Sequence, residues 1–444
     1  MLAHHYLSAL ELASAASQDT SGLAPRARAA LQAAGDRALA LNAFAAAAGY
    51  YRAALALWPR DAQEERAGLL RLLGTVLFEA GDASEAETVL AEGAEVAAAA
   101  DLPALRARIR ILLAGIQDQR GRSFADTLAE CEACIAVLEA GRDLEGLAEA
   151  WRLAGTLRYW LADSLAAKEA LERALAYARQ SGSHRAQMQA SGWLMVTFAA
   201  LPVPVDVAIA RAEQLLQEAV SDPWAQAAIL RWLALLHGYA GRFSDARAAL
   251  ARSQSLLGDC EGMWDRAVGD FTAGAMELIA GDPAAAERHL KNGYEKLRAM
   301  GDRGYRSTLV GMLAEALYAQ DRLVEAQQIT EEAEALATDD DIDVQARWRA
   351  TRAKLLARRG QFPAARQLTD QAVALVSRTS APLLQAQMLM AKAEVDRLAG
   401  APEQAKASLR AALRIYQSRH ATALADQAKA ALASLTDHPR AKPA

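Results

Sequence analysis

The chain has 444 residues, of which 53% are hydrophobic, 23% charged and 6% aromatic, which excludes an intrinsically disordered chain and allows a large core. About a quarter of the residues are alanine, the best helix former, so the composition disfavours all-β and α/β folds. A mixed net charge of −5 argues against a nucleic-acid-binding surface.

Residues 1–26 are expected to form an N-terminal helix and a linker, which could be the remnant of a preceding module. They lack the basic region and apolar run of a signal peptide. The uncharged stretch 186–205 is interrupted by polar residues and by Pro202 and Pro204, so it does not predict a membrane span. Three cysteines are too few for a disulfide framework. We therefore expect a cytoplasmic protein with no membrane partner.

A repeat with a period near 40 residues runs through the chain. Each unit has a buried-type small residue, usually alanine, at one recurring place, and ten such anchors follow one another at spacings of 38 to 41 residues. A high alanine content alone would not place small residues at this regular spacing. The anchors are Ala47, Ala86, Thr127, Ala167, Ala208, Ala246, Ala286, Ala326, Ala365 and Ala405.

A second small residue usually stands twelve positions before each anchor, and a bulkier apolar residue stands four positions after it. This pattern predicts two helices that approach closely through the small residues, with the bulky residue filling the space between them. In the fifth unit Gly192 lies sixteen positions before its anchor, so the turn with Pro202 and Pro204 is predicted to be longer and to flex or to change the curvature. The small residues are Gly35, Gly74, Gly115, Gly155, Ala234, Gly274, Ala314, Ala353 and Ala393.

Turn residues separate the two predicted helices of each unit. Glycine is expected to end the first helix in a left-handed conformation at Gly81, Gly241, Gly281, Gly360 and Gly400. Ser84, Ser244 and Asp282 are then predicted to cap the second helix, Ser84 within a capping box with Glu87, and Pro283 suits a first turn.

In these positions the chain resembles the tetratricopeptide repeat (TPR) family. Unit one has Gly35, Ala47, Tyr51 and Ala54 at the motif positions, and unit four adds an early tryptophan at Trp151. The period near 40 departs from the 34 residues of the standard motif. The resemblance implies an all-α, right-handed superhelical solenoid of about ten helix hairpins over residues 27–435, and we expect a disordered tail at 436–444.

The N-terminal region also resembles the junction that follows the ATPase module in bacterial AAA/STAND-type regulators. Some of these carry adenylate or guanylate cyclase domains, and others carry DNA-binding domains of the LuxR or MalT type. No G-x-x-x-x-G-K-[ST] phosphate loop occurs in this sequence. The resemblance implies a helical arm that could work with an ATPase or cyclase module in cis or in trans.

No residue pattern predicts catalysis, a cofactor or a metal. Cys131 and Cys134 occupy packing positions four and seven residues after Thr127, and Cys260 is far from them, so zinc would lack its four ligands. Adjacent His4 and His5 point to different helix faces. The acidic run 339–343 lacks the glycine and distal glutamate of a calcium loop, so we interpret it as a solvated loop. We expect no enzyme.

The resemblance implies that the first helix of each unit lines a concave face, with contacts at motif positions 2, 5, 9, 12 and 13. Arginines and aromatic residues recur there and could clamp an extended or carboxylate-bearing peptide; alternatively, they pair with acids and fill gaps between helices. The candidate concave-face residues are Arg71, Phe78, Arg120, Arg152, Tyr159, Trp160, Gln189, Trp193, Arg231 and Tyr239.

Two functional hypotheses follow. The first is a non-catalytic scaffold that binds a protein or peptide on the concave face. The second is a sensor arm of a larger ATPase-type signal-transduction or transcription regulator, which binds a small ligand or controls the ATPase. RNA binding by helical repeats would need a basic groove, and the acidic balance argues against it.

Overall fold

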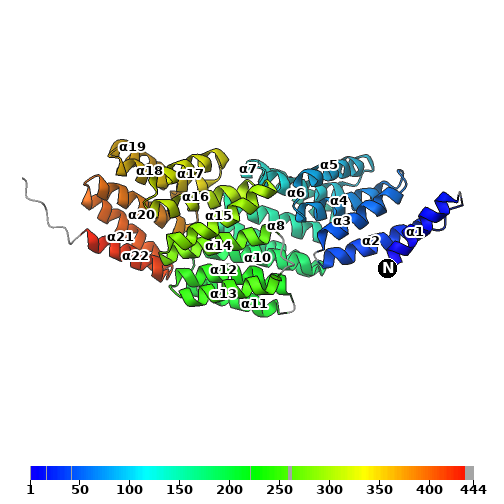
Figure 1. The fold of residues 1–444 in the computed structure, drawn as a ribbon, viewed down its shortest axis with the longest axis horizontal. Coiled ribbons are helices and arrows are strands. Elements are labelled where there is room, and N and C mark those ends of the chain that lie inside the picture. Colours follow the sequence, from blue (N-terminus) through cyan, green and yellow to red (C-terminus); the bar gives the residue numbers. More distant parts are fainter. Residues whose placement is uncertain (1, 17, 42, 221, 259–262, 436–444) are drawn as a thin grey trace, which may run out of the picture. The chain divides into compact units, whose positions relative to one another are not determined.

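The chain is all-helical. The computed structural model describes residues 2–16, 18–41, 43–220, 222–258 and 263–435, and within these ranges it has 22 α-helices and no strand (Figure 1). Cys260 and the predicted tail 436–444 lie outside the described residues. No helix within the described ranges is long and apolar enough to cross a membrane.

The helices follow one another with short connections. Their bounds are α1 (Leu2–Ala15), α2 (Ala24–Ala40), α3 (Phe44–Leu57), α4 (Gln63–Glu79), α5 (Ala83–Ala99), α6 (Pro103–Gln119), α7 (Phe124–Gly141), α8 (Leu144–Trp160), α9 (Ser164–Ser181), α10 (His184–Ala200), α11 (Val205–Glu218), α12 (Pro223–Tyr239), α13 (Phe243–Leu257), α14 (Met263–Ala280), α15 (Pro283–Met300), α16 (Gly304–Ala319), α17 (Leu323–Leu336), α18 (Ile342–Arg358), α19 (Phe362–Ser377), α20 (Pro382–Leu398), α21 (Pro402–Ser418) and α22 (Thr422–Ser434).

The ten predicted anchors mark the second helix of each pair. Each anchor is the fourth residue of an odd-numbered helix, from Ala47 in α3 to Ala405 in α21, and each is fully buried with 0% exposure. Consecutive helices pack against each other from α1 to α5 and from α9 to α22. The predicted stack of helix hairpins is therefore confirmed within these two runs, and the predicted phase holds at all ten anchors.

The small residues before the anchors let the paired helices touch. A Cβ on Gly35 would lie 2.5 Å from the Tyr51 ring, and one on Gly74 would lie 2.4 Å from Cγ of Leu90. Gly192 is different, since its Cβ would meet only Ala228, at 3.8 Å. The turn between α10 and α11 has four residues, 201–204, where most other pairs have three, so the predicted longer turn in the fifth unit is confirmed.

The turn glycines have the predicted left-handed backbone, with φ between +69° and +92° at Gly81, Gly241, Gly281, Gly360 and Gly400. Asp282 caps α15 by accepting from the backbone N–H of Ala285, as predicted. The caps predicted at Ser84 and Ser244 are wrong. Asp82 caps α5 instead, because α5 begins one residue before Ser84, and the N-cap of α13 is Arg242.

The helices group into two compact units, a division that the sequence did not predict. The first unit consists of Met1–Gln117 and Glu130–Ala150, and the second consists of Asp118–Ala129 and Trp151–Ala444. The first unit has a core of leucines, isoleucines and alanines around Tyr51, whose hydroxyl donates to Asp36. Cys131 and Cys134 are buried within it, and the Cys131 thiol donates to the carbonyl of Ala150.

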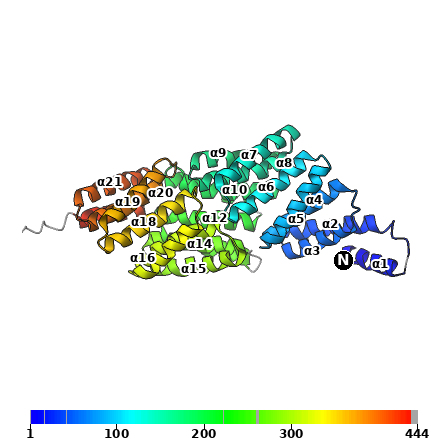
Figure 2. The same cartoon turned by 90° about the horizontal axis from the view of Figure 1, so that it is seen from above.

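In the second unit the even-numbered helices form an inner layer. From α10 to α20, each even-numbered helix contacts the next one, and Figure 2 shows α12 between α10 and α14. The odd-numbered helices from α9 to α19 pack outside their partners. The predicted assignment of the first helix of each unit to the inner face therefore holds here.

The second unit also closes on itself between segments about 215 residues apart. Asp340 accepts from the Ser123 hydroxyl and the Ala125 backbone N–H, both at 2.8 Å. The Ser164 hydroxyl donates to the carbonyl of Ser380, and the Val205 backbone N–H donates to the carbonyl of Arg419. These contacts join the start and the end of one turn of the stack.

At the turn with Pro202 and Pro204, Leu201 is buried and the Val205 backbone N–H donates to the carbonyl of Arg419. Flexing or a change of curvature at this turn stays a prediction. The acidic run was predicted as a solvated loop, and this is wrong at Asp341, which is 2% exposed because it caps α18 and accepts from the Ser307 hydroxyl.

Candidate binding site

A cavity of about 490 Å³ lies within the second unit. Its walls come from the inner helices α8, α10, α12, α14, α16, α18 and α20, and helices α21 and α22 close it near the end of the repeat. Ligand sites in proteins typically measure about 300–1,000 Å³ and combine apolar walls with a few polar groups. The inner layer of the stack thus lines a partly open cavity of ligand size.

Aromatic rings meet around Tyr305 on one side of this cavity. The Tyr305 ring centroid lies 5.0 Å from that of Trp160, 5.3 Å from that of Trp264 and 6.0 Å from that of Phe271, all edge-on. Tyr159 lies edge-on to Trp160 at 5.2 Å. Edge-to-face pairs each add about 0.5–1.5 kcal/mol beyond the buried area, so these contacts stabilise this wall.

Charged side chains of both signs also line the cavity. Arg347 donates from Nε to Asp343 at 2.8 Å. Lys354 is 7% exposed, and its Nζ lies 4.5 Å from the centroid of the Tyr318 ring. The Tyr318 hydroxyl in turn donates to Glu394, also on the cavity wall, at 2.6 Å. A buried cation that rests on an aromatic face remains available to a ligand anion.

The phenols of the cavity stay protonated. Burial raises the pKa of Tyr159, Tyr239, Tyr305 and Tyr416 above the ordinary value of 10. A protonated phenol can both donate and accept a hydrogen bond. The cavity therefore offers neutral polar groups beside its charged ones.

Three of the predicted site residues, Tyr159, Trp160 and Tyr239, line the cavity. Trp193 is half-buried and packs edge-on against Trp160 at 6.2 Å. Arg231 is 4% exposed, and its guanidinium bonds to the carboxylate of Asp265 at 2.9 Å and to the carbonyl of the same residue. These five residues belong to the inner layer of the second unit.

The other predicted residues of the second unit do not line this cavity. Arg152 on α8 and Gln189 on α10 are half-buried, and Arg120 is exposed directly after α6.

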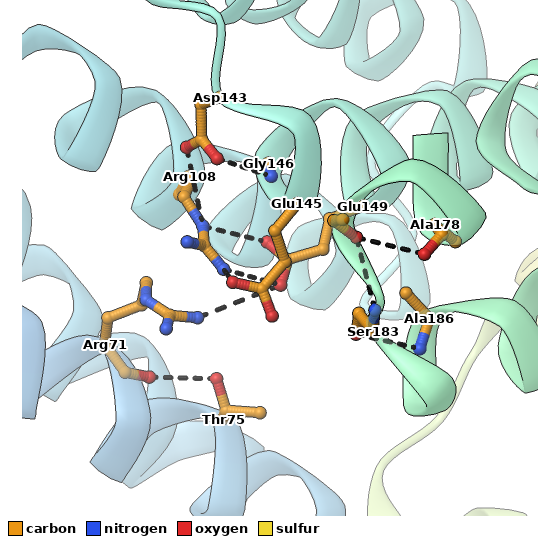
Figure 3. A network of polar contacts seen from close by, with 11 residues as sticks. Arg71, Thr75, Arg108, Asp143, Glu145, Gly146, Glu149, Ala178, Ser183 and Ala186 are labelled. Atoms are coloured by element: carbon orange, nitrogen blue, oxygen red, sulfur yellow. Dashed lines mark hydrogen bonds and ion pairs between the residues drawn. The ribbon is translucent and has the colours of Figure 1, made fainter. Parts of the chain in front are cut away.

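Arg71 and Phe78 belong to the first unit. Phe78 packs against the core of that unit. Figure 3 shows Arg71 in a network of charges, in which its Nη1 lies 3.8 Å from Oε1 of Glu149. Arg108 bonds to Glu149 at 3.1 Å and to Glu145 at 2.8 Å. Burial lowers the pKa of Arg71, and the Glu149 carboxylate opposes this effect.

Several cavity residues stand at motif positions 2 and 9, which were expected to face the inside of the repeat. The predicted site residues came instead from positions 5, 12 and 13 and from neighbouring arginines, glutamine and aromatics. In the ninth unit positions 2 and 9 hold Arg347 and Lys354, and position 9 holds Glu315 in the eighth unit and Glu394 in the tenth. All four line the cavity. Tyr305 and Tyr416 stand at none of these motif positions, and no pattern in the sequence predicted them.

The fold has counterparts among solved structures. A Rap protein complexed with the competence and sporulation factor superposes with a TM-score of 0.59 at 14% identity, over 82% of this chain and 99% of that one. Yeast Tom70 gives 0.40 at 13% identity, over 94% and 98% of the two chains. The apo quorum sensor NprR from B. thuringiensis gives 0.43 at 12% identity, over 67% and 81%.

These are TPR-like helical-repeat proteins, and the first likeness shows that the present chain has this all-α solenoid fold. No family model matches the sequence, and no curated protein matches it.

Proposed function

We propose that the chain is a non-catalytic scaffold that binds a protein or peptide partner on the inner layer of its second unit. The observation that carries the proposal is the cavity, whose walls combine an aromatic cluster with Arg347, Lys354 and Glu394. Aromatic and charged residues together can bind an extended peptide. The aromatic rings bury apolar side chains of the peptide, and the charged groups fix the register of the peptide along the site. The structure of the Rap protein, which has the same fold, was solved in complex with the competence and sporulation factor.

The proposal can be tested with peptides selected from a random heptapeptide library on the purified chain. Their affinity is measured by fluorescence polarisation, and their position by amide hydrogen exchange. We expect protection on the inner helices α12 to α18. Lys354→Met should weaken binding at least tenfold, because the variant removes the buried cation without changing the aromatic wall. Lys168→Met, on the outer helix α9, is the matched control and should bind normally.

Equal affinities of the two lysine variants and the wild type, with protection only on the odd-numbered helices, would place the interface outside the cavity. Protection confined to the first unit would move it to the neighbourhood of Arg71.

The second candidate is a sensor arm of an ATPase-type regulator, and the size of the cavity favours it. A space of about 490 Å³ suits a small ligand as well as a short peptide segment. This function predicts that a small molecule raises the melting temperature of the second unit by mass action, without any peptide present.

A further inference from the structure

Arg347 uses only one edge of its guanidinium within the protein. Its Nε donates to Asp343, and the side chain is 12% exposed on the cavity wall. Among the described residues no other hydrogen bond reaches this guanidinium. Its two Nη groups are therefore available, and two parallel N–H donors of this kind match the two oxygens of a carboxylate.

Glu315 presents the opposite charge to the same cavity from α16. It is half-buried, and its carboxylate has no hydrogen bond or ion pair to any residue that the structure describes. Burial opposes the charge of Arg347, but Asp343 and then Glu315 outweigh this effect and raise the pKa of Arg347. The charges of Arg347 and Glu315 therefore interact electrostatically, although the two side chains form no ion pair. A half-buried carboxylate is stabilised when a cation joins it.

Two tyrosines stand with these charges. Tyr416 is 2% exposed, and burial, then Glu315, raises its pKa. Burial also raises the pKa of Tyr239, while the Arg347 charge acts against it. In the described part of the chain neither hydroxyl has a hydrogen-bond partner. Each can donate to a carboxylate or accept from an ammonium group.

A ligand with only one charge would leave one of these groups unmatched. A carboxylate alone would leave Glu315 without a cation, and an amine alone would leave the Nη groups of Arg347 without an anion. Unmatched buried polar groups discriminate strongly between ligands, because their desolvation is not compensated. The aromatic rings beside them, among them Trp232 and Phe271, offer space for an apolar group.

We propose that the cavity binds a zwitterionic ligand with an aromatic side group, in which Arg347 and Tyr239 hold the carboxylate and Glu315 and Tyr416 hold the ammonium. This inference rests on the proposed function, since it names the chemistry that the same cavity binds. A free aromatic amino acid and a short peptide with unblocked termini both carry this chemistry.

The test uses three compounds with the same ring: L-phenylalanine, 3-phenylpropionate without the ammonium, and 2-phenylethylamine without the carboxylate. Binding to the purified full chain is measured by calorimetry. We expect L-phenylalanine to bind at least tenfold more tightly than either analogue. The tripeptide phenylalanyl-alanyl-phenylalanine, compared with its acetylated and amidated form, distinguishes the two sources: a tripeptide that binds more tightly than the amino acid, and only with free termini, identifies a peptide ligand.

Two charge-neutralising variants assign the charges. Arg347→Gln should reduce the affinity for L-phenylalanine to that of 2-phenylethylamine, and Glu315→Gln should reduce it to that of 3-phenylpropionate. Arg410 is exposed on α21 and does not line the cavity, so Arg410→Gln is the control and should change nothing. The wild-type comparison is decisive by itself if a variant fails to fold.

Equal affinities for the three compounds would overturn the zwitterion while leaving the cavity as a binding site. Failure of every zwitterion, while library-selected peptides still protect α12 to α18, would also overturn it and keep the proposed function. If neither the compounds nor the selected peptides bind, both proposals fail together.

Discussion

Gly155 on α8 and Leu171 on α9 approach so closely that a Cβ on the glycine would lie 2.6 Å from Cγ of the leucine and 3.2 Å from the carbonyl of Ala167. The same pairing recurs between Gly274 and Leu290 in a later repeat, at 2.5 Å. A glycine is therefore required at this position for the two helices to pack so closely, and its presence does not simply reflect the composition of the chain.

This contact predicts opposite effects for two similar substitutions. Gly155→Ala should lower the free energy of unfolding by about 1–3 kcal/mol, because the new methyl group overpacks the pair. Gly192→Ala, where the nearest atom is 3.8 Å away, should be neutral or stabilise by up to about 1 kcal/mol, since alanine favours the helix. Urea unfolding of both variants checks this. Equal losses would mean that the pair relaxes around the added methyl group.

The sequence predicted the pairing of helices well because the repeat encodes local contacts. An anchor such as Ala167 and its partner glycine lie twelve residues apart, so the requirement for small side chains recurs at a fixed spacing. The closure of the second unit could not be predicted in this way. Ser164 and Ser380 meet across 216 residues, and their small polar side chains carry no signal that distinguishes them from ordinary turn residues.

The candidate site was predicted in part for a related reason. Aromatic residues such as Trp160 stand out in an alanine-rich chain, whereas Arg347 and Glu315 look like ordinary surface charges of a helix. Only the inner position of their helices shows that they face the cavity. Arg231 shows the converse, because its position was predicted from the motif, while its bond to Asp265 depends on the neighbouring repeat.

The buried Asp341 predicts a pH dependence of stability. Burial, and then the charge of Asp343, raises its pKa from 3.8 to about 7. A group with a raised pKa in the folded state stabilises the fold below its unfolded pKa, and this stabilisation is lost as pH rises from about 4 through 7. Asp341→Asn keeps the capping oxygen and removes the titration.

The variant should therefore gain stability relative to the wild type between pH 5 and pH 8, by an amount on the order of 2–4 kcal/mol. Urea midpoints at the two pH values measure this difference. Asp339→Asn, exposed two residues earlier, is the control and should show no such gain. A difference between Asp341→Asn and the wild type that does not change with pH would show that Asp341 does not titrate in this range.

The charge network of the first unit predicts that Arg71→Glu destabilises that unit. Arg71 and Arg108 face the carboxylates of Glu145 and Glu149, and their side chains are 16% and 13% exposed. A new carboxylate at position 71 would leave Arg108 as the only arginine of this group. We expect a loss of about 2–4 kcal/mol, since a broken, partly buried pair leaves an uncompensated charge.

Arg71→Met should cost less, because Arg108 still holds Glu149, and Glu149→Gln should restore part of the stability of Arg71→Glu. Amide exchange on α4 to α6 reports the first unit separately. Additive effects of Arg71→Glu and Glu149→Gln would show that the two residues do not interact.

Asp340 connects the segments around residues 123 and 340, which lie at the two ends of the closed part of the second unit. We expect this connection to weaken first when Asp340 is replaced. Asp340 accepts from Ser123 and from the backbone N–H of Ala125, and these bonds outweigh burial and lower its pKa. Asp340→Ala leaves both donors unbonded at the start of α7. Amide exchange at residues 123–128 should therefore accelerate at least tenfold, while the amides of α12 stay protected, because the helix pairs themselves are intact.

The neighbouring Asp339 is exposed, so Asp339→Ala is the control and should leave this exchange unchanged. If α12 and residues 123–128 accelerate together, the closure and the inner layer unfold as one unit, and the cavity depends on the closure for its walls.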